Sequence, residues 1–211
     1  MRTLTKELQE KITPDMGIDL LKKGNERFVN NLKVNRNLLQ QVSDTSDSQH
    51  PFAVIISCMD SRTSAELVFD QGLGDIFSIR IAGNIINEEI IGSTEFGCKV
   101  VGAKVVVVLG HTQCGAINGA IADVDLGHLH FVTSKIKRCI PGLKKKSPFQ
   151  TDEDLCMSVT KMNIIQGIQD LRASSHILQS MIHEGELKIV AGLYDVSTGM
   201  VEFLDESEVG L

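Results

Sequence analysis

Short runs of consecutive apolar residues alternate along this chain with longer stretches in which apolar positions recur every three or four residues. The short runs are rich in valine and isoleucine and predict strands at residues 51–58, 75–80, 104–109, 187–194 and 200–204. The first and third runs do not alternate with polar residues, which is typical of strands buried on both faces. Buried strands separated by helices indicate an α/β protein with a mostly parallel central β-sheet flanked by helices.

The longer stretches have helical spacing and predict helices at residues 14–31, 87–101, 115–122, 126–140 and 158–184. The polar stretch at residues 35–50 is predicted to be a loop. We expect one domain over residues 1–211, with an N-terminal helical arm and loop at 1–50 and an α/β core at 51–211. Because the arm has no core of its own, we expect it to lie on something larger, which could be a second subunit.

Composition narrows the possible partners. The 211 residues include 21 Lys and Arg against 27 Asp and Glu, a net charge of −6, which argues against nucleic acid or an anionic membrane as a partner. No apolar run approaches the roughly 18 residues of a transmembrane helix, and the first residues lack a signal-peptide core, so we expect a cytoplasmic protein. The five cysteines are an odd number, which favours metal binding or reactivity over a disulfide framework.

Two polar segments directly follow predicted strands. Residues 58–62 (Cys-Met-Asp-Ser-Arg) follow the first strand, and residues 110–115 (Gly-His-Thr-Gln-Cys-Gly) follow the third. Ligands of open α/β sheets bind outside the carboxyl ends of the strands, where both segments lie. His111 and Cys114 are spaced to share one metal ion, and Cys58 completes a Cys₂His set that favours zinc. Three protein ligands leave one position open, as in catalytic zinc sites.

Asp60 and Arg62 project to the same side as Cys58 if this segment stays extended. Asp60 could then accept a hydrogen bond from a hydroxide bound to the zinc ion, or it could itself fill the fourth metal position. Arg62 would decide between the two by pairing with Asp60 and holding it off the metal. Taken singly, each residue has an ordinary explanation in packing or a surface ion pair; their coincidence at two strand ends favours a site.

At these residues the chain resembles the β-class carbonic anhydrases, over most of residues 24–203. The family patterns C-x-D-S-R, G-H-x-x-C-G and R-x-x-G-N match residues 58–62, 110–115 and 80–84. The resemblance implies a Zn²⁺ ion held by Cys58, His111 and Cys114, with the Asp60–Arg62 pair beside it. It implies a zinc lyase that reversibly hydrates carbon dioxide to bicarbonate and a proton through hydroxide held by the zinc.

The resemblance also assigns residues that handle the substrate. Gln49 matches a glutamine whose amide orients substrate, often from the neighbouring subunit, and Gly115 matches a backbone N–H donor beside the last ligand. Phe77, Ala82 and Phe96 match positions that line a small apolar pocket. The allosteric subtype carries a tryptophan that this chain lacks, which implies the non-allosteric, plant-like subtype. The family further implies a homodimer or homotetramer in which the N-terminal helix embraces the partner.

Three other functions compete with this interpretation. A carbon disulfide or carbonyl sulfide hydrolase on the same scaffold would use the same zinc chemistry. A zinc alcohol dehydrogenase also has a Cys₂His site, but residues 72–77 lack the third glycine of a dinucleotide-binding loop and precede a strand. A non-catalytic, zinc-stabilised binding protein would fill the fourth position with another Cys or His, against which the Asp60–Arg62 pair argues.

Overall fold

The computed structural model describes residues 3–141 and 152–205. Within these residues, the strands form one sheet in the order β2-β1-β3-β4-β5. Their bounds are β1 (Ala53–Ser57), β2 (Ile76–Arg80), β3 (Val105–His111), β4 (Lys188–Tyr194) and β5 (Val201–Phe203). The strands β2, β1, β3 and β4 are parallel, and β5 pairs antiparallel with β4. The expected mostly parallel sheet is confirmed.

The central strands differ from the edge strand β2 in the way their residues are buried. Every residue of β1 and β3 is buried, which explains why their sequences are apolar without interruption. In β2, only Ile76 is buried, and the following residues alternate between partly buried and exposed. The sheet therefore has a fully covered centre, and the two motifs follow the two strands at that centre.

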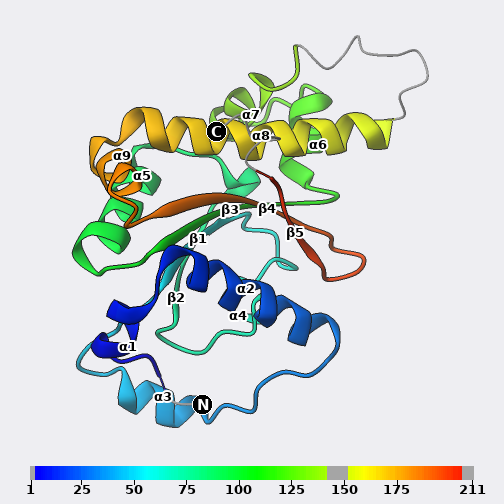
Figure 1. Ribbon diagram of the computed structural model, residues 1–211. Coiled ribbons are helices and arrows are strands. Elements are labelled where there is room, and N and C mark those ends of the chain that lie inside the picture. The colour runs from blue at the N-terminus through cyan, green and yellow to red at the C-terminus, as the bar shows by residue number, and fades with distance from the viewer. Residues whose placement is uncertain (1–2, 142–151, 206–211) are drawn as a thin grey trace.

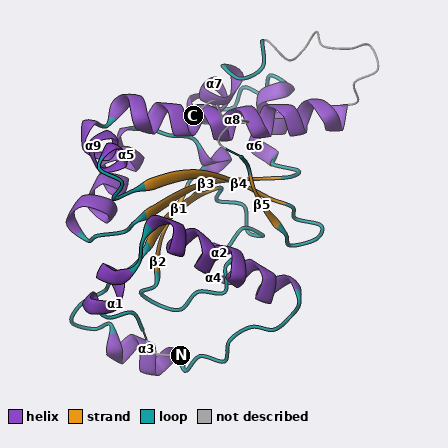
Figure 2. Ribbon diagram, in the orientation of Figure 1, coloured by secondary structure: helices purple, strands orange, loops and turns teal. Residues whose placement is uncertain are grey.

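Helices cover both faces of the sheet (Figure 1). On one face lie α5 (Glu88–Glu95), α8 (Asp152–Ser174) and α9 (His176–His183). Their apolar side chains, such as Ile164 and Ile168, pack with Val54 and Ile56 of β1. Colouring by secondary structure shows the strands enclosed between these helices and those of the other face (Figure 2).

The second face is covered by α2 (Pro14–Val29) and the short helix α4 (Ala65–Val68). Leu21 of α2 is fully buried there, a burial that contributes about 1.5–3 kcal/mol. Asn25 ties α2 to the rest of the chain, because its Nδ2 donates to the carbonyl oxygens of Val68 and Gly199 at 3.0 and 2.9 Å. The helix of the N-terminal arm thus packs on its own core, and a contact with a partner subunit stays a prediction.

A third apolar cluster lies next to the carboxyl ends of β1 and β3. It is formed by α6 (Gly115–Ile121) and α7 (Leu129–Lys137), with Ile117 and Ile136 at its centre. Cys58 and Cys114 belong to the same cluster. The helices α6 and α7 therefore provide the apolar wall behind both cysteines.

Several helices depart from the expected bounds. The helix expected at residues 158–184 is two helices, because Ser175 lies between α8 and α9 and caps α9. The helix expected at 87–101 ends in a π-helical turn, η2 (Phe96–Val100). The prediction of a loop at 35–50 was wrong in part, because α3 (Leu38–Asp44) forms there behind an Asn37 cap; α1 (Lys6–Lys11) was not foreseen either. No helix among the described residues has the length and apolarity needed to cross a membrane.

Candidate metal centre

Cys58, His111 and Cys114 converge at the carboxyl ends of β1 and β3. Cys58 follows the last residue of β1, His111 ends β3, and Cys114 is the residue before α6. Because β1 and β3 are parallel neighbours, the two segments start from the same edge of the sheet. The ligand atoms of the three side chains all lie within 4.8 Å of one another, and all three residues are buried.

The two nitrogens of His111 have different surroundings. Nδ1 lies 2.9 Å from the carbonyl oxygen of Thr112, and since a carbonyl can only accept, Nδ1 carries the proton. Nε2 is buried without a hydrogen-bond partner in the described chain. A buried polar atom without a partner is costly, and an unprotonated Nε2 offers a lone pair that a cation would satisfy.

The sulfur positions also fit zinc. Cys58 Sγ and Cys114 Sγ are 4.0 Å apart, close to the about 3.8 Å expected for two thiolates bound at about 2.3 Å on a tetrahedral zinc ion. The two thiols share a hydrogen bond in which either sulfur could donate, and this contact lowers the pKa of Cys58 and raises that of Cys114. A divalent cation that binds both sulfurs would displace the thiol protons.

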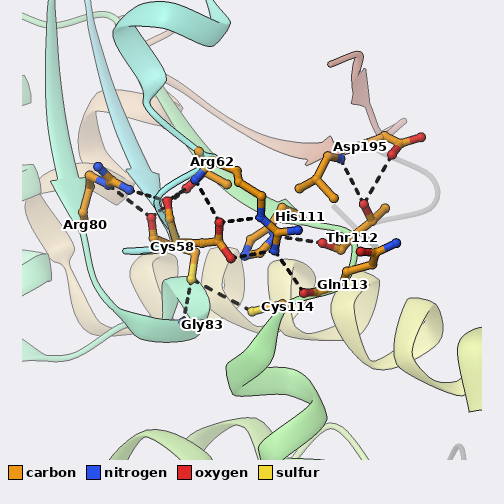
Figure 3. Close-up of polar contacts among 12 residues, drawn as sticks. Cys58, Arg62, Arg80, Gly83, His111, Thr112, Gln113, Cys114 and Asp195 are labelled. Carbon is orange, nitrogen blue, oxygen red and sulfur yellow. Dashed lines mark hydrogen bonds and ion pairs between the residues drawn. The ribbon is translucent and has the colours of Figure 1, made fainter. Parts of the chain in front are cut away.

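Gly83 supports Cys58 from a neighbouring turn. The backbone N–H of Gly83 donates to Cys58 Sγ at 3.3 Å (Figure 3), and its carbonyl accepts from Asn163 Nδ2 at 2.9 Å. Gly83 has a φ of +66°, and an added Cβ would lie 2.8 Å from Ile136 Cδ1. Only glycine fits this position, which explains the glycine of the R-x-x-G-N pattern.

Asp60 and Arg62 form a two-pronged ion pair at the rim of the cluster. Arg62 Nε donates to Asp60 Oδ1 at 2.9 Å, and Nη2 donates to Oδ2 at 2.7 Å. These hydrogen bonds hold the pKa of Asp60 well below its usual range, so the carboxylate is ionised near neutral pH. Arg62 Nη2 also lies 3.4 Å from the carbonyl oxygen of Gln113, which links the pair to the second motif. Of the two possibilities for Asp60, the geometry favours the carboxylate held by Arg62.

Arg80, the last residue of β2, fixes the backbone of the first motif. Its guanidinium donates to the carbonyl oxygens of Cys58 and Asp60 (Figure 3). Arg80 is the first residue of the R-x-x-G-N pattern, which by itself assigns the side chain no role. Its position directly at the carboxyl end of a strand was the signal that could have assigned one.

Comparison with known proteins agrees with this geometry. The family model described as carbonic anhydrase matches residues 53–201. Carbonic anhydrase 2 of Mycobacterium tuberculosis is 34% identical, over 88% of this chain and 90% of its own. The chain belongs to the β-class carbonic anhydrases. The carbonic anhydrase of Mycolicibacterium smegmatis is 31% identical, over 86% of this chain and 89% of its own.

Solved β-carbonic anhydrases share the fold. CafA of Aspergillus fumigatus superposes with a TM-score of 0.73 at 23% identity, covering 82% of this chain and 86% of its own. The β-carbonic anhydrase CcaA superposes with a TM-score of 0.70 at 26% identity, covering 90% of this chain and 94% of its own. The allosteric or non-allosteric subtype is not decided by these likenesses and stays a prediction.

The residues expected to handle substrate are not gathered at the cluster in one chain of this carbonic anhydrase. Gln49 is exposed and lies before the amino end of β1, whereas Cys58 follows its carboxyl end. Gln49 borders a surface hollow of about 470 Å³ with Leu73 and Gly74. Phe77 and Phe96 together line another surface hollow, of about 490 Å³.

Ala82 and Gly115, in contrast, lie beside the cluster. Ala82 directly precedes Gly83, whose amide contacts Cys58. Gly115 begins α6 next to Cys114, and an added Cβ there would meet no atom within 4 Å. Two of the five residues assigned to substrate are therefore near the metal ligands within one chain.

Sequence reasoning also missed the contacts of Thr112 and Asp195. Asp195 follows β4 at the same edge of the sheet as the two motifs, and its side chain reaches Thr112 (Figure 3). The rule that ligands gather at strand carboxyl ends applies to β4 as much as to β1 and β3. Applied to the fourth strand as well, it would have pointed to Asp195.

Proposed function

We propose that this chain is a zinc-dependent enzyme that reversibly hydrates carbon dioxide to bicarbonate and a proton. The observation that carries the proposal is the unpartnered Nε2 of His111, which faces two buried cysteines within 4.8 Å. Cys58, His111 and Cys114 are the proposed zinc ligands. Three protein ligands, rather than four, are the pattern of a catalytic rather than a structural zinc site.

A zinc ion held there supplies a hydroxide nucleophile near neutral pH, an effect for which carbonic anhydrases are the usual illustration. The chain contributes the orientation of the reacting groups. Asp60 is ionised and fixed by Arg62, so it can act only as a hydrogen-bond acceptor. By accepting a hydrogen bond from the attacking hydroxide, it would orient the lone pair of the hydroxide oxygen toward carbon dioxide. We propose that the Gly115 N–H, at the amino end of α6, donates to the developing carboxylate oxygens.

The proposal includes a second copy of the chain, as a homodimer or homotetramer. Gln49, Phe77 and Phe96 lie away from the proposed ligands of their own chain, so we propose that a partner copy supplies them. Two β-carbonic anhydrases from Sordaria macrospora, of similar fold, are described as tetrameric. Exposed leucines on and near α3, Leu38 and Leu39, offer apolar surface for such a contact. The cytoplasmic location expected from the sequence stays a prediction.

One experiment tests the chemistry. The purified protein should contain about one zinc per chain and should hydrate carbon dioxide in a stopped-flow assay. Asp60→Asn should keep the zinc and lose about 10²–10³-fold in turnover, because the ionised acceptor is gone. Asp19→Asn, on the exposed surface of α2, serves as the control. Hydrolysis of carbonyl sulfide or carbon disulfide without carbon dioxide hydration would replace this proposal with the alternative enzyme.

A further inference from the structure

The turn between β4 and β5 contacts the second motif through Thr112. The Thr112 hydroxyl donates to Asp195 Oδ1 at 3.4 Å and accepts from the backbone N–H of Val196 at 3.1 Å. The backbone N–H of Thr112 also donates to the carbonyl oxygen of Tyr194, at 2.9 Å. Thr112 is thus held through both its backbone and its side chain by a segment more than 80 positions later in the sequence (Figure 3).

Asp195 is itself firmly placed. Its Oδ1 accepts from the backbone N–H of Ser197 at 2.8 Å, which holds the pKa of Asp195 below its usual range. Its backbone N–H donates to Met200 and its carbonyl accepts from Gly199, at 2.9 and 2.8 Å. The carboxylate that receives the Thr112 hydroxyl is therefore part of a closed, hydrogen-bonded turn and not a mobile surface group.

The position of Thr112 affects the orientation of His111. The carbonyl oxygen of Thr112 accepts the proton of His111 Nδ1 at 2.9 Å, and this bond leaves Nε2 as the free lone pair. The next residue, Gln113, has a φ of +54°, an uncommon conformation that turns the chain sharply there. The direction of the Thr112 carbonyl therefore depends on how the rest of Thr112 is held. The partner of the second ring nitrogen sets both the tautomer and the orientation of a ligating histidine.

We propose that Thr112 and Asp195 are positioning residues for the metal ligand His111. The Asp195 carboxylate and the Val196 amide fix the Thr112 hydroxyl, and Thr112 in turn fixes the carbonyl that aims His111 Nε2 at the ion. The inference rests on the proposed function only in taking the bound ion as zinc. It adds the β4–β5 turn, which carries none of the proposed ligands, to the parts of the chain that determine metal affinity.

The test is the zinc affinity of Thr112→Val, which keeps the side-chain shape and removes both hydrogen bonds of the hydroxyl. We expect the affinity to fall about 10–100-fold, the usual effect of losing an outer contact of a ligand. Competition with a chromogenic chelator measures it. Thr112→Ser keeps the hydroxyl and should restore the affinity. The cobalt-substituted protein should show an altered visible spectrum for Thr112→Val and a normal one for Thr112→Ser.

A matched control separates positioning from general stability. Thr94→Val removes the hydroxyl of a buried threonine, which donates to the carbonyl oxygen of Ile90 within α5, away from the cluster. It should leave zinc affinity and the cobalt spectrum unchanged. If wild-type protein binds zinc tightly and Thr112→Val binds it equally well with the same spectrum, the inference is overturned while the proposed function stands. If wild-type protein binds no zinc, the proposed function fails and the inference fails with it.

A second variant covers the case in which Thr112→Val does not fold. Asp195→Asn weakens the acceptor of the Thr112 hydroxyl on a partly exposed residue, and zinc affinity should fall several-fold. Because it also removes a negative charge near the ion, Glu153→Gln is the charge-matched control; Glu153 lines the same groove as Thr112 and Asp195 but is exposed on α8. An equal loss of affinity in both variants would assign the effect to charge and overturn the role of Asp195.

Discussion

The proposed metal ligands and the residues proposed to handle substrate are arranged in contrasting ways. Cys58, His111 and Cys114 are buried within 4.8 Å of one another, and neighbouring groups orient Cys58 and His111. Gln49 is exposed at the far end of β1, and Phe96 is 54% exposed in a separate hollow. On the proposed assignments, one chain would assemble the metal site but not the whole active site. Metal affinity should depend on the chain alone, and turnover on its assembly.

The largest expected effect comes from removing one ligand. Cys114→Ser replaces a thiolate by a poor zinc ligand, so zinc content should fall to near zero. Carbon dioxide hydration should fall more than about 10³-fold, because the metal provides several kcal/mol of transition-state stabilisation. Zinc analysis and a stopped-flow assay check both results. Cys98→Ser, at a buried cysteine in the core between sheet and helices, should keep zinc and activity. If Cys114→Ser kept its activity without zinc, Cys58, His111 and Cys114 would not be the ligands of a catalytic metal.

The N-terminal arm has an anchor of its own, far from the metal ligands. Asp70, whose side chain is 3% exposed, pairs with Arg27 of α2 at 2.6 Å and with Arg36 beyond it. It also accepts from the backbone N–H of Val34 at 3.2 Å. One carboxylate therefore holds the end of α2 and the segment that follows it against the turn after α4.

Removing this charge should affect stability and leave the metal site intact. Asp70→Asn should lower the free energy of unfolding by about 3 kcal/mol, because Arg36 stays buried without its partner. Asparagine tolerates the positive φ of this position, so the backbone is not the cause. Urea unfolding measures the loss, and zinc content should not change. Asp19→Asn, which removes an exposed ion pair with Lys23, should cost less than about 1 kcal/mol.

The pH dependence of the same variant gives a second check. Burial raises the pKa of Asp70, but Arg27 and Arg36 outweigh it, and the net pKa is lowered. A lowered pKa means that the contribution to stability is complete above the unfolded value of about 3.9 and is lost as the pH falls through the folded value. The difference between wild type and Asp70→Asn should therefore be constant near neutral pH and narrow in acid. A difference that widens in acid would contradict the ion-pair explanation.

The sequence predicted the parts of the fold that follow from continuous or periodic apolar patterns. The runs at β1 and β3 identified the centre of the sheet, and with it the edge where both motifs meet. The break at Ser175 could not be read this way, because apolar spacing continues across it. The break depends on a tertiary contact, in which the Ser175 hydroxyl donates to Glu95 at 2.6 Å while capping α9.

The candidate site, like the fold, was predictable only where local sequence patterns determine it. Residue types and spacing predicted the three proposed metal ligands, since each lies at or just after the end of a strand. The roles of Arg80, Thr112 and Asp195 depend on hydrogen bonds between segments far apart in the chain, such as the contact between Thr112 and Asp195. Periodicity carries no information on such contacts. If a partner supplies Gln49, as we propose, its place relative to the metal depends on a contact between two chains, on which the pattern within one chain carries no information.

The smallest single effect tests that dependence most directly. Gln49→Ala should reduce turnover about 10-fold, the value of one hydrogen bond that strengthens in the transition state. Zinc content should stay at wild-type level, because Gln49 lies away from the ligands of its own chain. The decisive measurement is the activity of a mixture of two inactive or weakly active variants. The Gln49→Ala chains keep the three proposed metal ligands, and the Cys114→Ser chains keep Gln49. If a partner supplies Gln49, every hybrid dimer contains one complete site.

Random pairing of equal amounts makes half of the dimers hybrids, so the mixture should reach about one quarter of wild-type activity. If Gln49 serves its own chain, the mixture should stay near one twentieth, the activity of the Gln49→Ala chains alone. Mixing Gln49→Ala with the double variant Gln49→Ala/Cys114→Ser is the control, because no chain then offers the glutamine. A mixture that stays at the control level would show that Gln49 does not act on the metal site of a partner chain. The proposal that metal is bound within one chain while substrate is handled by residues of two chains would then be wrong.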